Sequence, residues 1–320
     1  MFNLVGGAAP LEKQHTLRGT LSCVGVGLHG GQRVSLAVRP APGDSGIVFL
    51  RRDVPAGRGV IPARWDAVVD TQLCTMLSNE HGITVATIEH LMAALAGCGV
   101  DNALVELDGP EVPIMDGSSA PFVALIEQVG RVAQARPRRM IRVLAPLEVQ
   151  EGDKFARLEP GPAVELAVEI DFPSTVIGAQ SFELTLAGRA FARQVAHCRT
   201  FGFKADLERL WARGQALGGS LNNAILVDGD RVVNPQGLRC PDEFVRHKLL
   251  DCVGDLALAG APLLGRFQGY KPGHGLNNRL LRALFLNPQA WCWEPAGVQQ
   301  GKTAGSPVLA VPQTPSATTG

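Results

Sequence analysis

Residues 241–260 read PDEFVRHKLLDCVGDLALAG, and this stretch predicts a long helix around which the rest of the chain can be organised. Pro241 suits the first turn of a helix, and Gly260 followed by Pro262 is a typical stop signal. One face of the helix is apolar and would pack into a core; it carries Val245, Leu249, Cys252, Leu256 and Ala259.

A second face of the same helix carries three ionisable side chains at four-residue spacing, those of His247, Asp251 and Asp255. Residues four apart lie one above another on a helix, so the three project together. The spacing fits two interpretations. One is a solvated face or an Asp–His pair without a metal. The other is part of a zinc site, since an imidazole and a carboxylate at this spacing can chelate one Zn²⁺ and leave room for a third ligand.

The dipeptide Glu89-His90 offers that third ligand. Thr87 is placed to cap a helix that ends before Gly97. The apolar face of this helix carries Ile88, Leu91, Met92 and Leu95. A helix start favours the neutral, metal-binding form of an imidazole. Glu89 points about 100° away from His90 and can reach a water on the same metal, as a general base does. Taken alone, the pair also fits a surface dipeptide without function.

A third candidate is His274, which stands between glycines in KPGHGLNN, residues 271–278. This pattern predicts a loop histidine, with Asn277 or Asn278 capping the next helix. A nearby carboxylate such as that of Asp255 would favour the cationic imidazole, which can act as an acid or oxyanion donor. The alternative is an exposed histidine in a glycine-rich turn. The other histidines without evident partners are interpreted as structural: His15, His81 and His197.

The remaining patterns divide the chain into two parts. The basic, proline-broken stretch 131–139 marks the boundary, which gives domains over residues 1–135 and 136–293 and a disordered tail over 294–320. Strands are predicted within 15–39, around the glycine-rich turn 25–31, and over 102–107, 141–150, 154–159, 163–171 and 224–233. Helices are predicted over 120–129 and near 206–217.

Composition excludes several classes of protein. The 320 residues carry 30 basic and 30 acidic side chains, so a basic surface for nucleic acid is not expected. The sequence has no apolar run long enough for a membrane span, and its first fifteen residues make a poor signal peptide, so none is expected. Seven cysteines without a Cys-x-x-Cys pair argue against a disulfide framework or a four-thiolate zinc site and favour the cytoplasm.

A match to the dinucleotide-binding pattern at Gly25–Gly30 is discarded. That pattern needs a helix to begin at the glycines, so that the helix N-terminus meets the pyrophosphate. Residues 32–40 instead alternate as a strand does and end at a proline. A nucleotide-dependent oxidoreductase is therefore the weaker hypothesis.

Five motifs in order resemble the zinc-dependent UDP-3-O-acyl-N-acetylglucosamine deacetylase family of lipid A biosynthesis. They are TIEHL (87–91), PIMDGS (113–118), CRTFGF (198–203), DEFVRHKLLD (242–251) and GHGLNN (273–278). The resemblance spans about residues 14–293. It implies an α+β fold of two similar sheet-plus-helix domains with the metal site between them. It also implies a cytoplasmic, monomeric enzyme of a Gram-negative bacterium that removes the N-acetyl group of UDP-3-O-(3-hydroxyacyl)-N-acetylglucosamine and releases acetate.

The resemblance also implies roles for individual residues. One Zn²⁺ per chain would be held by His90, His247 and Asp251, with Glu89 as general base. Further expected catalytic residues are His274, oriented by Asp255, and Thr200. Expected substrate contacts are Lys248, Phe201, Lys154, Leu73, Cys74 and Gly219, and an insert over about 202–233 would line a channel for the acyl chain. Two alternatives remain: a zinc deacetylase of another N-acetylated sugar, and a non-catalytic binding protein on the same scaffold.

Overall fold

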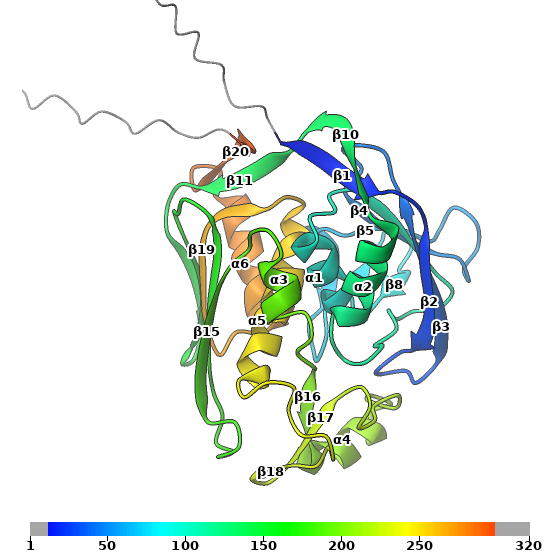
Figure 1. Ribbon diagram of the computed structural model, residues 1–320, viewed down its shortest axis with the longest axis vertical. Helices are drawn as coiled ribbons and strands as arrows, with labels where there is room; N and C mark the ends of the chain where they lie inside the picture. Colours follow the sequence, from blue (N-terminus) through cyan, green and yellow to red (C-terminus); the bar gives the residue numbers. More distant parts are fainter. Residues whose placement is uncertain (1–11, 298–320) are drawn as a thin grey trace, which may run out of the picture.

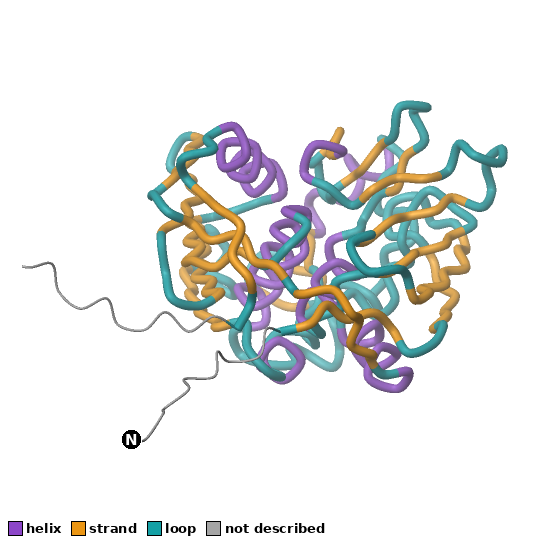
Figure 2. Tube along the Cα trace, turned by 90° about the horizontal axis from the view of Figure 1, so that it is seen from above, coloured by secondary structure: helices purple, strands orange, loops and turns teal. Residues whose placement is uncertain are grey.

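The computed structural model describes residues 12–297, which form four layers (Figure 1). A sheet lies at each outer side, and helices from both halves of the chain fill the space between the sheets, as the view from above also shows (Figure 2). Helices and mixed sheets that alternate in this way make an α+β protein, so the predicted fold class is confirmed.

The sheet of the first half has the strand order β2-β3-β9-β4-β5. Its strands are β2 (Leu21–Val26), β3 (Arg33–Pro40), β4 (Ile47–Arg51), β5 (Val60–Pro62) and β9 (Ala103–Leu107). The glycine-rich turn does join β2 to β3 as an antiparallel hairpin. Buried residues alternate along β3 with exposed ones, because only one face of this sheet meets the core.

The sheet of the second half is larger and centres on β19 (Leu263–Tyr270). This strand pairs with β13 on one side and with β14 and β11 in parallel. The other strands are β11 (Arg139–Val143), β12 (Leu147–Glu151), β13 (Lys154–Glu159), β14 (Val164–Asp171), β15 (Ala179–Thr185) and β20 (Trp291–Pro295).

Smaller sheets complete the two halves. One holds β6 (Val68–Asp70), β7 (Met76–Ser78) and β8 (Thr84–Val85), and another pairs β1 (Lys13–Leu17) with β10 (Arg131–Pro137). The insert at one end of the molecule contains β16 (Phe201–Phe203), β17 (Ile225–Asp228) and β18 (Arg231–Val232) beside the short helix α4 (Leu207–Ala212) (Figure 1).

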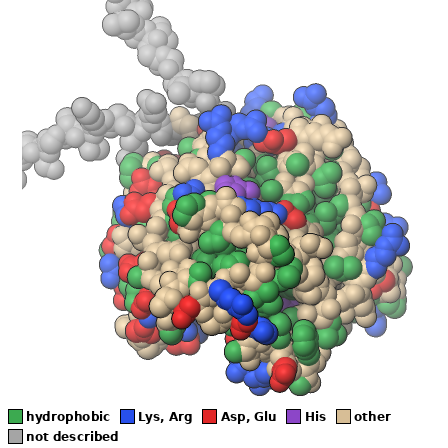
Figure 3. All heavy atoms as spheres, turned by 60° about the horizontal axis from the view of Figure 1, so that its bottom comes forward, with side chains coloured by type: hydrophobic (Ala, Val, Ile, Leu, Met, Phe, Trp, Pro, Cys, Tyr) green, Lys and Arg blue, Asp and Glu red, His purple; other side chains and the backbone are tan. Residues whose placement is uncertain are grey.

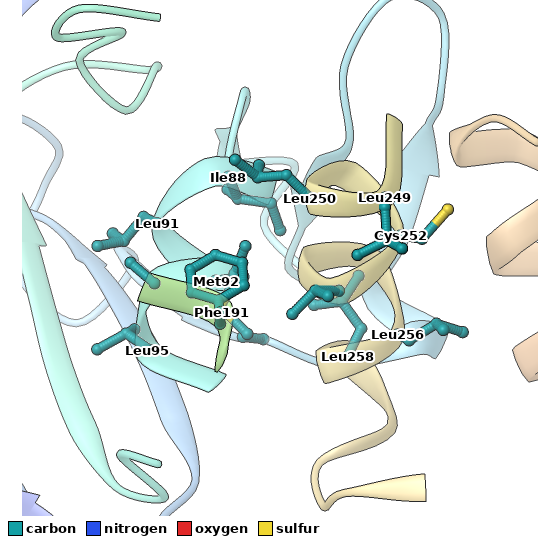
Figure 4. Close-up of a cluster of buried hydrophobic side chains, with 14 of the residues drawn as sticks. Ile88, Leu91, Met92, Leu95, Phe191, Leu249, Leu250, Cys252, Leu256 and Leu258 are labelled. Atoms are coloured by element: carbon teal, nitrogen blue, oxygen red, sulfur yellow. The ribbon is translucent and has the colours of Figure 1, made fainter. Parts of the chain in front are cut away.

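Two helices meet at the centre of the molecule, α1 (Glu89–Gly97) and α5 (Glu243–Leu256). Their apolar faces interlock in a buried cluster that Phe191 of α3 (Ala190–Gln194) also joins (Figure 4). The other helices are α2 (Ala120–Val129) and α6 (His274–Leu286), with single 3₁₀ turns at Trp65–Ala67, Lys204–Asp206 and Ala257–Ala259. The core therefore presses a helix of one half against a helix of the other.

Two predicted helix starts differ from the structure. Thr87 does not cap α1: its backbone is left-handed at φ 56°, and its hydroxyl donates to Glu111 at 2.9 Å. Ile88 occupies the capping position. Pro241 precedes α5, which begins at Glu243, because Asp242 takes the capping position with non-helical angles.

Two other segments also differ. The predicted boundary stretch 131–139 forms β10 leading into β11; β10 is exposed on both faces and so shows no apolar alternation. The helix near 206–217 is reduced to a 3₁₀ turn and α4, since Gly214 adopts a positive φ of 69°. Residues 291–295 form β20 on β11, so the tail begins later than residue 294, and residues 298–320 lie outside the described part.

Gly254 is expected to be a sensitive position at the contact between α1 and α5. A Cβ at this position would stand 2.1 Å from the backbone oxygen of Glu89, and backbone cannot yield as a side chain can. Overpacking costs about 1–3 kcal/mol when neighbours can relax. Gly254→Ala should therefore lower the free energy of urea unfolding by about 3 kcal/mol or more.

The matched control is Gly202→Ala. A Cβ at Gly202 meets no atom within 4 Å, so this variant should unfold close to the wild type. Equal unfolding midpoints for the two variants would show that α5 can move away from Glu89 at little cost.

Candidate metal centre

Helices α1 and α5 bring three potential metal ligands together at the boundary between the two halves. His90 Nε2 lies 3.6 Å from Asp251 Oδ1, and His247 Nε2 lies 3.3 Å from the same oxygen. One ligand atom of each residue lies within 4.8 Å of the others. All three side chains are buried, as is Asp255, so the solvated-face interpretation of α5 is wrong.

Hydrogen bonds and burial keep His247 and Asp251 in the forms that can bind a metal. His247 Nδ1 donates to the backbone oxygen of Cys198 at 3.1 Å; a carbonyl only accepts, so Nε2 keeps its lone pair facing Asp251. Burial lowers the pKa of His247 to about 4, which keeps the imidazole neutral. Burial alone would raise the pKa of Asp251, but His247 and Lys248 hold it well below its usual value. Lys248 Nζ donates to Asp251 Oδ2 at 2.7 Å.

Two imidazoles and a carboxylate form a donor set that suits a divalent transition metal. The set is incomplete in the way that catalytic sites are, since three protein ligands leave a position for water or substrate. The residues of the chain therefore fit a bound metal, and their side chains already converge.

Glu89 stands next to this cluster as the first residue of α1. Its side chain is 3% exposed, and Oε2 accepts the backbone N–H of Thr75 at 3.1 Å. Burial raises the pKa of Glu89, and the charges of His274 and His90 offset this only in part. The carboxylate is therefore a stronger base than an exposed glutamate.

His274 pairs with Asp255 in the same site. Its Nδ1 donates to Asp255 Oδ2 at 2.8 Å. Burial alone would lower the pKa of His274, but Asp255, followed by Glu89 and Asp251, raises it to about 9. The imidazole is thus a cation at neutral pH.

The local structure around His274 differs from the prediction. His274 is the first residue of α6, not part of a loop, and Asn277 and Asn278 lie inside that helix. The extended backbone of Gly273, with φ −159°, caps the helix and accepts the N–H of Asn277 at 3.0 Å. The Asn277 side chain donates instead to Asp255 at 2.8 Å.

Sequence analysis missed Thr75, which links the carboxylates of Glu89 and Asp255. Thr75 donates its hydroxyl to Asp255 Oδ1 at 2.6 Å, while its backbone N–H holds Glu89. It lies between β6 and β7, where no periodic pattern or motif marks it. Only the fold brings this loop to both carboxylates.

The expected substrate contacts fall into two groups. Phe201 lies at the centre, with its ring 6.3 Å from that of His247, and the adjacent Thr200 donates its backbone N–H to Gly117 at 2.8 Å. Lys248 is bound to Asp251, and Cys74 directly precedes Thr75.

The other expected contacts lie farther out. Leu73 is 47% exposed and has a left-handed backbone at φ 67°. Gly219 lies in the insert near Leu28, and Lys154 is exposed at the start of β13. No described contact joins Lys154 to the three potential ligands.

Comparison with known proteins identifies the family of this chain. Residues 14–286 match the family described as LpxC, UDP-3-O-acyl N-acetylglycosamine deacetylase. The chain belongs to the LpxC family. It is therefore a deacetylase and a hydrolase, as predicted, and the non-catalytic alternative is set aside.

Relatives of the LpxC family cover almost the whole chain, and each is named UDP-3-O-acyl-N-acetylglucosamine deacetylase. The protein of Phenylobacterium zucineum is 54% identical over 278 residues, which is 87% of this chain and 95% of that relative. The protein of Acidithiobacillus ferrooxidans is 50% identical and covers 87% and 92% of the two chains. That of Xanthomonas campestris is 48% identical and covers 94% and 100%. Within residues 12–297, no helix is long and apolar enough to cross a membrane.

Proposed function

We propose that this chain removes the N-acetyl group of UDP-3-O-(3-hydroxyacyl)-N-acetylglucosamine with the help of one zinc ion, in the cytoplasm, as an early step of lipid A biosynthesis. The observation that carries the proposal is the convergence of His90, His247 and Asp251 in a buried site that also holds Glu89 and the His274–Asp255 pair. The names of the relatives support the substrate.

His90, His247 and Asp251 would hold the zinc ion. Bound zinc supplies Lewis-acid polarisation of the acetamide carbonyl and lowers the pKa of its water to about 7. Lys248 keeps the second oxygen of Asp251 occupied, so that one carboxylate oxygen remains directed at the imidazoles.

Glu89 would act as the general base. Its carboxylate takes a proton from the attacking water while the water oxygen bonds to the carbonyl carbon. The Thr75 N–H holds one carboxylate oxygen, which orients the other for this proton transfer. The C–N bond then breaks, acetate leaves, and the sugar nitrogen receives a proton from Glu89 or His274.

The His274 cation would stabilise the negative charge that develops on the carbonyl oxygen. Asp255 holds the imidazole in place, and its own oxygens are held by Thr75 and Asn277. Thr200 would donate its hydroxyl to the same charge. Removing one such donor typically lowers the rate by about 10²–10³-fold.

The insert would provide the apolar channel for the acyl chain. Trp211 and Leu217 of the insert are 52% and 53% exposed, so both offer apolar surface to a ligand. Leu217 is anchored through its backbone N–H to His29 of the β2–β3 turn at 3.0 Å. Several hydrophobic side chains are exposed on the face at this end of the molecule, among charged ones (Figure 3).

The experiment that tests the proposal compares acetate release from acylated and non-acylated UDP-N-acetylglucosamine by the zinc-loaded chain. We expect the acylated substrate to be strongly preferred, because only it fills the apolar channel. Equal rates with both substrates would favour the alternative of a deacetylase for another N-acetylated sugar. Full activity after zinc removal would overturn the metal assignment.

The pH dependence provides a second test, through Asp255→Asn. The pKa of His274 is raised to about 9, so its cation is present below that pH and lost above it. Removing the Asp255 charge takes away the largest influence that raises this pKa, so burial, which lowers it, is offset only by Glu89 and Asp251. The alkaline limb of kcat/KM should therefore begin near pH 9 in the wild type and at clearly lower pH in the variant.

The control is Asp66→Asn, which removes an exposed carboxylate that pairs with Arg64. Its alkaline limb should coincide with that of the wild type. If Asp255→Asn leaves the limb in place as well, a group other than His274 sets it.

A further inference from the structure

A second cluster of metal-binding side chains lies outside the site described above. It consists of His197, Cys198 and Cys240, each of which has a ligand atom within 4.8 Å of the others. The two sulfur atoms lie 3.9 Å apart. Cys198 is fully buried, whereas His197 and Cys240 are partly exposed.

We propose that these three side chains form a second cation site, which takes one thiophilic divalent ion such as Zn²⁺. Two thiolates bound to one tetrahedral Zn²⁺ at about 2.3 Å stand about 3.8 Å apart, close to the distance between the sulfurs here. Sulfur and imidazole donors select soft or borderline ions over Mg²⁺ or Ca²⁺. The partly exposed side of the cluster leaves the fourth position to water.

Glu243 fixes the positions of the two segments that carry Cys198 and Cys240. Its carboxylate is fully buried and accepts the backbone N–H of Arg199 at 2.9 Å and that of Arg239 at 2.6 Å. Arg199 follows Cys198, and Arg239 precedes Cys240, so each cysteine neighbours an anchored residue. A site whose backbone is held in this way needs little rearrangement on binding.

The sulfur separation matches a bound metal better than a disulfide. A disulfide brings the sulfurs to about 2.05 Å, whereas two sulfurs that share one ion at about 2.3 Å stand close to the distance found here. Each thiol releases its proton as its sulfur binds the ion, so one divalent cation replaces two protons and the net charge does not change.

The cluster also touches the first site through the backbone. The oxygen of Cys198 accepts the Nδ1–H of His247 and thereby sets the orientation of that imidazole. An ion on the Cys198 sulfur would restrain the same residue. The second site would thus act as a structural anchor behind the metal centre of the deacetylase.

Cobalt substitution tests this proposal independently of the proposed function. The first site has no sulfur ligand, so thiolate-to-cobalt charge-transfer absorption reports only the second. The full-length chain, purified under reducing conditions and loaded with Co²⁺, should bind two ions and show the near-ultraviolet band. The double variant Cys198→Ser/Cys240→Ser should bind one ion and lose the band.

Two further variants complete the test. Cys240→Ser alone changes a partly exposed side chain and should also lose the band. This single variant keeps the test valid if the double variant does not fold. Cys23→Ser/Cys292→Ser removes two other partly exposed cysteines and should keep both ions. His247→Ala should keep the band while losing the other ion, so failure of either site can be told from failure of the other.

Several outcomes would overturn the proposal. One is a single bound cobalt without a thiolate band in the wild type. A second is a band that survives in both cysteine variants. A third is a mass lower by two hydrogens at Cys198 and Cys240 when the chain is purified without reductant, because this would show that the pair forms a disulfide.

Discussion

His247→Ala is expected to empty the metal centre between α1 and α5 and to reduce deacetylase activity to the metal-free level. His247 supplies one of three converging donors, and its loss leaves His90 and Asp251 alone. Changing an outer partner of a metal ligand already costs about 10–100-fold in affinity or activity, so loss of a ligand should cost more. The measurements are metal content by mass spectrometry and acetate release.

The control for this variant is His81→Ala. The His81 imidazole is partly exposed, and its charged neighbour is Glu80 at 3.9 Å, on the surface. This variant should keep the metal content and activity of the wild type. Circular dichroism should show His247→Ala to be folded, since α5 keeps its apolar face. Wild-type metal content and activity in His247→Ala would rule out the proposed ligand set.

The ligand cluster illustrates what could be predicted from the sequence. His247 and Asp251 share a helix face because of the helical period, which is a local property. The sequence also marks His90, but only as a candidate, since the distance between α1 and α5 is a property of the folded core. Burial then decides between the two interpretations of the spacing. The spacing of residues along a helix does not show whether that face is buried.

The positions that escaped prediction depend on contacts between distant segments. Thr75 bonds to Asp255, which is 180 residues away in the sequence, and no pattern in the sequence around Thr75 predicts this contact. Asn277 suits a cap by residue type, yet Gly273 takes that role and frees the amide for Asp255. Cys198 and Cys240 are likewise 42 residues apart and meet only in the fold.

Glu89→Gln is expected to lower kcat by about 10²–10⁴-fold, the usual contribution of a general base. The glutamine oxygen can still accept the Thr75 N–H, so the geometry of the site should persist. Its amide cannot accept the proton of the attacking water. Metal content should stay at the wild-type value, because Glu89 is not among the three converging ligands.

The pH profile separates loss of a base from a change in shape. Burial raises the pKa of Glu89, so wild-type activity should fall on the acidic side as this carboxylate gains a proton. In Glu89→Gln the residual rate should show no such limb, whereas Glu80→Gln, at an exposed residue, should behave as the wild type. An acidic limb that persists in Glu89→Gln would assign it to another group. Only a lower rate together with a flat acidic side identifies the Glu89 carboxylate as the proton acceptor, because a displaced substrate would lower the rate at every pH and keep the limb.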